Sequence, residues 1–130
     1  MQKFLTGGCW EFAWQLRKLL GRSAKFIFLY EPKRFEWFSF PGDIHHVLVE
    51  YKGAFYDAVN RYESASDILS WWEQRARDFK QTLNGPLALA PFDKNWLRDC
   101  EIERKPSLFW SAMRRAKQVA DVAKGEANAA

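Results

Sequence analysis

The sequence lacks any long hydrophobic run, and this excludes a transmembrane helix. No apolar stretch approaches the roughly 20 residues that a helix needs to cross a bilayer. The first eight residues, Met-Gln-Lys-Phe-Leu-Thr-Gly-Gly, contain no apolar segment as long as that of a signal peptide. We therefore expect a cytoplasmic protein with no membrane association.

Cysteine is scarce as well, since the chain contains only Cys9 and Cys100. Without an export signal, both thiols are expected to stay reduced, because the cytosol disfavours structural disulfides. The sequence has no Cys-x-x-Cys motif and no cluster of cysteine and histidine. We therefore expect no zinc site, no other metal site and no cofactor.

Internal repeats are also absent, and 130 residues correspond to one domain with a single core. Apolar residues make up 48% of the chain and charged residues 28%, which is typical of a folded globular protein rather than a disordered one. Only the end of the chain is low in complexity. We predict one domain over residues 1–124 and a flexible, frayed tail over residues 125–130.

The net charge of +4 raises the question of a polyanionic partner. Basic residues such as Arg114, Arg115 and Lys117 alternate with other residues in a pattern typical of a solvated helix face. Aromatic and basic residues also gather over positions 33–40, where they fit either a single-strand binding patch or the rim of a core. No nucleic-acid-binding motif accompanies the charge, so we favour a protein or peptide partner over nucleic acid.

Hydrophobic patterning predicts an α+β fold. Apolar residues at helical spacing predict a helix over residues 9–20 that Gly21 stops. Residues 25–30, 45–51 and 54–58 are rich in β-branched and aromatic residues and predict strands. A further strand is predicted over residues 36–40, followed by a turn at residues 41–43.

The second half of the chain predicts two helices. Ser64 or Ser66 can cap a helix that runs to about residue 83, where Asn-Gly-Pro stops it. Residues 87–98 are predicted as a loop with a short turn, and a last helix begins near Pro106. The expected architecture is an N-terminal cysteine-bearing helix packed on a small antiparallel sheet, followed by two helices.

The sharpest local signal is Gly-Gly-Cys-Trp-Glu-Phe-Ala at positions 7–13. Cys9 falls on the first turn of the predicted helix, where unpaired amides and the helix dipole favour a thiolate. A thiolate is a nucleophile, so this position suits covalent catalysis. The alternative is that Cys9 is a small apolar residue buried at a helix start.

The predicted hairpin supplies partners for such a thiolate. If Lys52 and Gly53 form a two-residue loop, alternation along the strands places His46 and Asp57 on one face and His45 on the other. A carboxylate diagonal to an imidazole can fix its tautomer and orientation. Cys9, His46 and Asp57 are therefore the candidate nucleophile, base and orienting group.

These residues also resemble a known superfamily. Positions 7–13 resemble the nucleophile segment of papain-like cysteine peptidases, which have a Gly-x-Cys-Trp-x-Phe pattern. Positions 46–51 and 55–57 are similar to the His and Asp strands of transglutaminase-like and NlpC-like members of that superfamily. The resemblance covers roughly the first 60 residues. It implies a short bacterial or phage papain-like domain with a Cys9-His46-Asp57 triad, in which Gly8 and Trp10 contact the substrate.

Two functions of different classes follow as expectations. The first is a thiol-dependent hydrolase or acyl transferase that acts on an amide bond through an acyl-enzyme on Cys9. The second is a non-catalytic phage or mobile-element protein that uses the same fold to bind and inhibit a host protein. Thiol reactivity separates them, because a catalytic Cys9 should alkylate far faster than Cys100, which lies among charged residues and is assigned no role.

Overall fold

An antiparallel sheet lies at the centre of the molecule. The computed structural model describes residues 3–32, 42–83 and 85–129, and within these ranges the sheet has the strand order β4-β3-β2-β1-β5. Its strands are β1 (Lys25–Pro32), β2 (Gly42–Tyr51), β3 (Ala54–Tyr56), β4 (Arg61–Tyr62) and β5 (Ala88–Pro91). The long strands β1 and β2 are paired over most of their length and form its middle.

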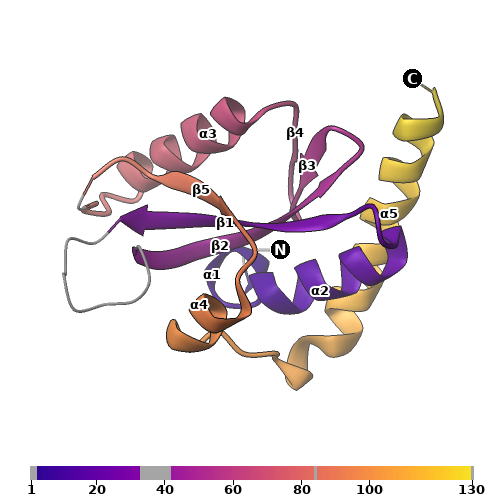
Figure 1. Ribbon diagram of the computed structural model, residues 1–130, viewed down its shortest axis with the longest axis horizontal. Coiled ribbons are helices and arrows are strands. Elements are labelled where there is room, and N and C mark those ends of the chain that lie inside the picture. Colours follow the sequence, from indigo (N-terminus) through magenta and orange to yellow (C-terminus); the bar gives the residue numbers. More distant parts are fainter. Residues whose placement is uncertain (1–2, 33–41, 84, 130) are drawn as a thin grey trace.

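Helices cover both faces of this sheet. Those of the described ranges are α1 (Lys3–Thr6), α2 (Cys9–Leu20), α3 (Ala65–Asp78), α4 (Lys94–Asp99) and α5 (Phe109–Ala129), with a 3-10 turn η1 (Pro106–Leu108) before α5. Figure 1 shows α3 on one side of β1 and β2, and α1, α2 and α4 on the other. The predicted α+β class and the N-terminal cysteine-bearing helix on an antiparallel sheet are confirmed. No helix of the described ranges is both long enough and apolar enough to span a bilayer.

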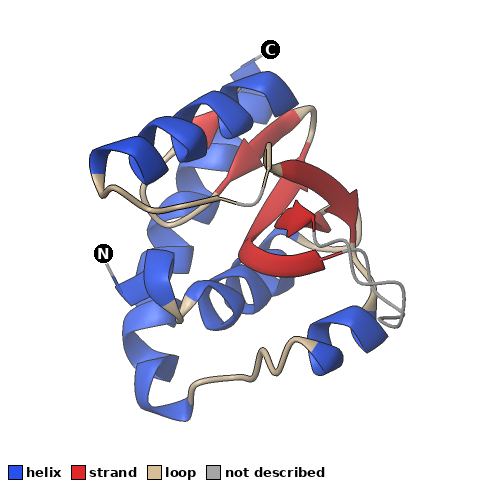
Figure 2. Cartoon of the chain, turned by 90° about the vertical axis from the view of Figure 1, so that its left-hand side faces the viewer, coloured by secondary structure: helices blue, strands red, loops and turns tan. Residues whose placement is uncertain are grey.

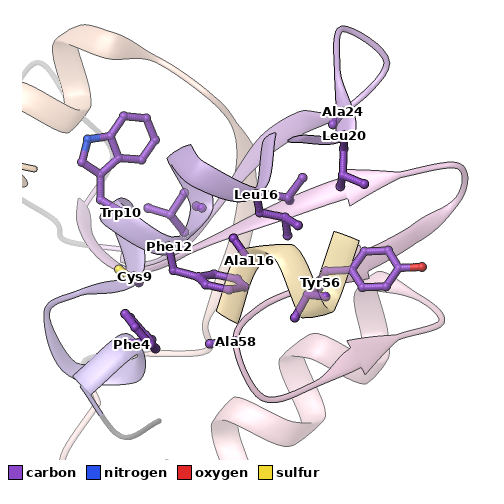
Figure 3. Close-up of a cluster of buried hydrophobic side chains, with 14 of the residues drawn as sticks. Phe4, Cys9, Trp10, Phe12, Leu16, Leu20, Ala24, Tyr56, Ala58 and Ala116 are labelled. Carbon is purple, nitrogen blue, oxygen red and sulfur yellow. The ribbon is translucent and has the colours of Figure 1, made fainter. Parts of the chain in front are cut away.

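The larger core lies between the sheet, α2 and α5. Its side chains on α2 are large and fully buried, Phe12 and Leu16 among them, whereas those on α5 are small. Ala112 and Ala116 have no exposed surface, so the two helices approach closely (Figure 3). A second cluster lies on the opposite face, where Leu48 of β2 meets Ile68 of α3. The β2 strand is therefore buried on both sides, which fixes the position of every residue along it.

The β2–β3 hairpin has the predicted two-residue loop. Tyr51 pairs with Ala54, and the loop residues Lys52 and Gly53 have φ values of +52° and +84°. Two successive positive φ angles are those of a type I′ turn, whose twist matches that of the strands. Glycine needs no extra energy to adopt this region of backbone space. The prediction that places His46 and Asp57 on one face depends on this loop.

The structure differs from the prediction near the start of β2. Gly42 and Asp43, predicted in a turn, are the first residues of β2, because β1 runs on through Pro32 and pairs with them. Leu29 pairs with His46 but Tyr30 pairs with Ile44, so His45 is an extra residue in β2. This irregularity is a β-bulge, which redirects the side chains that precede it.

The end of α3 also differs from the prediction. Ser64 caps the helix by accepting a hydrogen bond from the Asp67 amide at 3.2 Å, as expected. The helix then stops at Asp78 rather than near residue 83. Lys80 has a φ of +54°, and the Gln81 amide donates to the Ala76 carbonyl at 2.8 Å. These are the features of a Schellman motif, here formed without the usual glycine.

Residues 87–98 form regular structure rather than the predicted loop. They contain β5, which pairs with β1, and α4, which Asp93 caps through the amides of Asn95 and Trp96. The helix α5 continues through residues 125–129, which were predicted as a frayed tail. Glu126 in this segment accepts a hydrogen bond from the hydroxyl of Tyr56. The predicted strand at residues 36–40 and the aromatic and basic patch at residues 33–40 lie outside the described residues.

Candidate active site

Cys9 is the first residue of α2, and a tight turn connects α1 to it. The Gly8 amide donates to the Lys3 carbonyl at 2.8 Å, which folds α1 back against the start of α2. A Cβ atom on Gly8 would lie 2.7 Å from the Leu108 side chain and 2.8 Å from the Lys3 carbonyl. Only glycine fits at this position. Gly8 therefore allows α1, the start of α2 and Leu108 to pack closely together next to Cys9.

His46 lies between Cys9 and Asp57. Its Nε2 is 3.2 Å from Oδ2 of Asp57, and the histidine side chain is only 1% exposed. Its Nδ1 makes no hydrogen bond of good geometry within the described residues. The thiol of Cys9 nevertheless interacts with this ring strongly enough to affect both pKa values. The thiol and the imidazole are therefore neighbours, without a hydrogen bond of regular geometry to the Nδ1 atom.

Asp57 is held by four hydrogen bonds, counting the one to His46. Its Oδ1 accepts from the backbone amides of Val59 and Asn60 at 2.9 and 2.8 Å, which closes the turn after β3. Its Oδ2 accepts from the hydroxyl of Tyr62 at 2.8 Å and also faces His46. The carboxylate therefore has a fixed orientation, set by the turn on one oxygen and by side chains on the other.

The charges of the site favour a thiolate and imidazolium pair. Burial opposes ionisation of Cys9, but its interaction with His46 and hydrogen bonds from the backbone of Val47 and Trp10 outweigh burial, so the pKa of the thiol is lowered. Burial likewise opposes a charge on His46, yet Asp57 and Cys9 raise the pKa of the imidazole to about 9. The pKa of Asp57 is lowered, because hydrogen bonds from His46, Val59 and Tyr62 outweigh its burial.

The ring of Trp72 covers the imidazole of His46. Its ring centroid lies 4.4 Å from that of His46, with the two planes tilted by 38°. Trp72 is itself buried in the second core cluster, so its position is set by packing of α3 on the sheet. An aromatic face next to an imidazolium stabilises the positive charge and keeps water from the His46–Asp57 contact.

A groove of about 430 Å³ reaches Cys9. It runs between the end of α3 and residues 101–105, which connect α4 to η1. These two walls lie on opposite sides of the sheet in both views of the chain (Figures 1 and 2). Cys9, itself only 7% exposed, and Gly7 line the groove, and apolar side chains such as Ile102 and Leu87 complete it. The thiol is thus buried but is approached from one side by an open channel.

Gly8 and Trp10, which are predicted to contact a substrate, do not line this groove. Gly8 is packed between α1 and Leu108, as described above, and Gly7 lines the groove in its place. The ring of Trp10 packs on Phe26 at 4.8 Å and on Phe92 at 6.0 Å, in the core next to β1. Figure 3 shows this ring directed away from the sulfur of Cys9. The Trp10 side chain therefore anchors α2 on the sheet.

His45 lines the groove together with Cys9, which alternation along β2 did not predict. Its Nε2 lies 2.8 Å from Oε1 of Glu31 on β1. The bulge at His45 accounts for this, since an extra residue shifts the alternation of side chains before it. Arg115 also differs from its prediction as a solvated residue, because its Nε donates to the Ala58 carbonyl at 2.7 Å and joins α5 to the turn that begins at Asp57.

Cys100 has the environment of an unreactive thiol. Its sulfur donates to the Gly42 carbonyl at 3.7 Å, and burial is the largest of the effects that raise its pKa. Both cysteines are free thiols. The contrast between them is electrostatic, because Cys9 has an imidazole and backbone amides for neighbours and Cys100 has carboxylates.

Tyr62, Trp72 and Glu11 are the parts of the site that the sequence did not reveal. Tyr62 and Trp72 lack a local motif, since each reaches His46 or Asp57 only through the fold. Glu11 lies inside the motif at positions 7–13. It is 1% exposed, and it accepts hydrogen bonds from Nε of Arg104 at 2.7 Å and from the Lys105 amide at 3.2 Å. Glu11 is a charged residue on the apolar side of α2. Because charged side chains are rarely buried without a partner, its position in the sequence could have indicated an ion pair.

Comparisons with known proteins identify no relative. No protein-family model, no curated protein and no solved structure matches the chain. Within the described residues, no three side chains of the kinds that ligate metals come together. The chemistry of the site therefore has to be argued from its own geometry.

Proposed function

We propose that this protein is a papain-like thiol hydrolase or acyl transferase that acts on amide bonds of a peptide or protein. One observation carries the proposal: His46 contacts Asp57 through Nε2 and has Nδ1 left for Cys9, whose thiol pKa is lowered. A nucleophile, a base and an orienting carboxylate in this order are the requirements for covalent acyl transfer. A reduced Cys9 fits the cytoplasmic location expected from the sequence.

The proposed reaction begins with attack of the Cys9 thiolate on the carbonyl carbon of the amide. The C–S bond forms as the carbonyl electrons move to oxygen, and the backbone amide of Cys9, which has no acceptor within α2, donates to that oxygen. The imidazolium of His46 then gives its proton to the nitrogen as the C–N bond breaks, and an amine leaves. Water, or a second amine, attacks the thioester carbon as His46 takes its proton, and the C–S bond then breaks, which releases the acid or the new amide and regenerates the thiolate.

Differential alkylation tests the proposal. The two cysteines are treated with iodoacetamide at pH 6.5, and the rate of modification of each is followed by mass spectrometry of its peptide. We expect Cys9 to react at least about tenfold faster than Cys100, because the pKa of Cys9 is lowered and that of Cys100 is raised, so Cys9 has the larger thiolate fraction. A Cys100→Ser variant isolates the Cys9 signal. Equal rates for the two thiols would contradict the proposal.

A non-catalytic binding protein is the second candidate. It is favoured by large apolar side chains on the surface, of which Trp110 on α5 is 66% exposed. Trp110 lies at the start of α5 and is not among the residues that line the groove. If Cys9 proves unreactive while the protein keeps its biological effect, inhibition of a partner through this surface becomes the better proposal.

A further inference from the structure

The last turns of α3 bring an arginine to the wall of the groove. Arg75 lines the groove together with Cys9. Its guanidinium carbon lies 5.3 Å from the ring centroid of Trp72, and Trp72 in turn contacts His46. Arg75 is therefore two contacts from the base of the proposed reaction and faces the same space as the nucleophile.

Phe79 holds this guanidinium from a second side. Its ring centroid lies 4.9 Å from the guanidinium carbon of Arg75, and its side chain is 67% exposed. A phenylalanine this exposed gains little from burial of its own, so the contact with Arg75 is the interaction that its position serves. Two aromatic rings around one guanidinium fix its plane and reduce the entropy that Arg75 loses when it binds a ligand.

The charge of Arg75 is not neutralised within the protein. No carboxylate of the described residues forms an ion pair or a side-chain hydrogen bond with Arg75, although Arg61 has two such ion pairs and Arg98 and Arg104 have one each. A braced guanidinium with free donors is suited to bind a carboxylate through paired hydrogen bonds. The facing wall carries two carboxylates, Glu101 and Glu103, against one cation, Lys105, so its net charge is negative and favours a carboxylate on the α3 side.

We infer that Arg75 binds a carboxylate of the substrate, on the α3 side of the amide that Cys9 attacks. The inference rests on the proposed function and narrows its substrate class to amides that carry a free carboxylate near the scissile bond. Such a group is a chain-terminal carboxylate or an acidic side chain of a peptide. Arg75 acts as a binding residue and takes no part in bond breaking.

Two alkylating agents that differ only in charge test this inference without a known substrate. Iodoacetate carries a carboxylate and iodoacetamide is neutral, and with both the Cys9 thiolate forms an S–C bond as iodide leaves. The measured quantity is the ratio of the two rates at Cys9, at pH 7 and low salt. We expect Arg75→Gln to lower this ratio about threefold to fivefold, through the iodoacetate rate alone.

Arg77→Gln is the matched control. Arg77 lies on the same helix, is exposed, donates to Gln74 and does not line the groove. Its substitution therefore removes one positive charge from α3 and leaves the groove unchanged. Phe79→Ala keeps the charge of Arg75 but removes one of the two rings that contact its guanidinium. This variant should lower the ratio of the two rates by a smaller factor than Arg75→Gln does. Melting temperatures of all variants establish that they fold.

The outcomes separate the two proposals. A ratio that falls for Arg75→Gln and not for Arg77→Gln supports the inference. A ratio that stays the same in Arg75→Gln, or falls equally in Arg77→Gln, overturns it while leaving Cys9 a reactive nucleophile. If Cys9 reacts no faster than Cys100 with either reagent in the wild-type protein, the proposed function fails, and the inference that rests on it fails too.

Discussion

Tyr62 and His46 share one oxygen of Asp57. The Tyr62 hydroxyl donates to Oδ2 at 2.8 Å, and His46 Nε2 lies 3.2 Å from the same atom. Burial and the charge of Asp57 raise the pKa of Tyr62, so the phenol remains a protonated donor at any pH at which the protein works. Tyr62 therefore holds the carboxylate in place for the imidazole.

Removal of this hydroxyl should weaken both the fold and the site. We expect Tyr62→Phe to cost about 1–3 kcal/mol of unfolding free energy, because a buried carboxylate loses one of its donors. The reaction of Cys9 with iodoacetamide at pH 6.5 should slow severalfold, since a less well oriented Asp57 stabilises the imidazolium less. Urea denaturation and alkylation rates measure the two effects.

Tyr51→Phe serves as the matched control for this substitution. Tyr51 is similarly buried, but its hydroxyl makes no hydrogen bond within the described residues. Its loss should change stability by less than about 0.5 kcal/mol. If the two variants were equally stable and equally reactive, Tyr62 would have no role in positioning Asp57.

The two adjacent histidines should differ sharply in their effect on Cys9. His46→Ala removes the imidazole that lowers the pKa of the thiol, so this pKa should rise to or above its ordinary value of about 8.5. His45→Ala should leave it unchanged, because His45 pairs with Glu31 instead. The pH dependence of iodoacetamide reaction at Cys9 reports the thiol pKa in each variant, and equal shifts would show that the assignment of the base is wrong.

Acyl transfer and alkylation should depend on pH differently. Below the lowered pKa of Cys9 the thiolate is protonated, so both reactions slow as the pH falls. Above about pH 9, His46 loses the proton that the leaving amine needs, so only acyl transfer slows. We expect a bell-shaped profile for release of an aromatic amine from an activated anilide and a sigmoidal one for iodoacetamide. Because the two groups titrate as a pair, each limb belongs to the pair.

Substitution of the cysteine distinguishes an enzyme from a binding protein. Cys9→Ala should fold with a loss of about 1 kcal/mol, because the side chain belongs to the same core cluster as Phe4 and Phe12 and its loss leaves only a small void. Cys9→Ser keeps the size of the side chain but has a hydroxyl whose pKa is far too high for His46 to ionise. Both variants should lose whatever cellular effect the protein confers. A stable Cys9→Ala variant with the full effect would leave the binding role as the explanation.

The hairpin was the most predictable part of the site. Gly53 after a β-rich run identifies a two-residue loop, and the alternation of side chains then places His46 beside Asp57. The helix from Cys9 to Leu20 follows from its apolar spacing and the glycine after it. Both inferences depend on local geometry that is the same in any protein. The sequence alone was therefore sufficient to place Cys9 at the start of a helix and His46 beside Asp57.

The errors at His45 and at β5 have a different cause, because they depend on contacts that are distant in the sequence. The bulge at His45 is set by pairing with β1, so no local pattern reveals that His45 faces the groove. The end of α3 rests on Lys80 in a conformation that usually selects glycine. The strand β5 has only four residues and pairs with a segment about 60 positions earlier. The walls of the groove could not be predicted for the same reason.

The packing of α2 on α5 has a consequence for the order of synthesis. The helix that carries Cys9 is synthesised before residues 109–129, which bury its apolar face. The groove likewise receives residues 101–105 only after His46 and Asp57 have been in place for some time. We expect released chains that end before residue 109 to show no preferential alkylation of Cys9 over Cys100, and chains that include residues 109–129 to show it. The reactive thiol would thus form only once residues 109–129 have been made, so that a shorter nascent chain carries no active nucleophile beside other nascent chains.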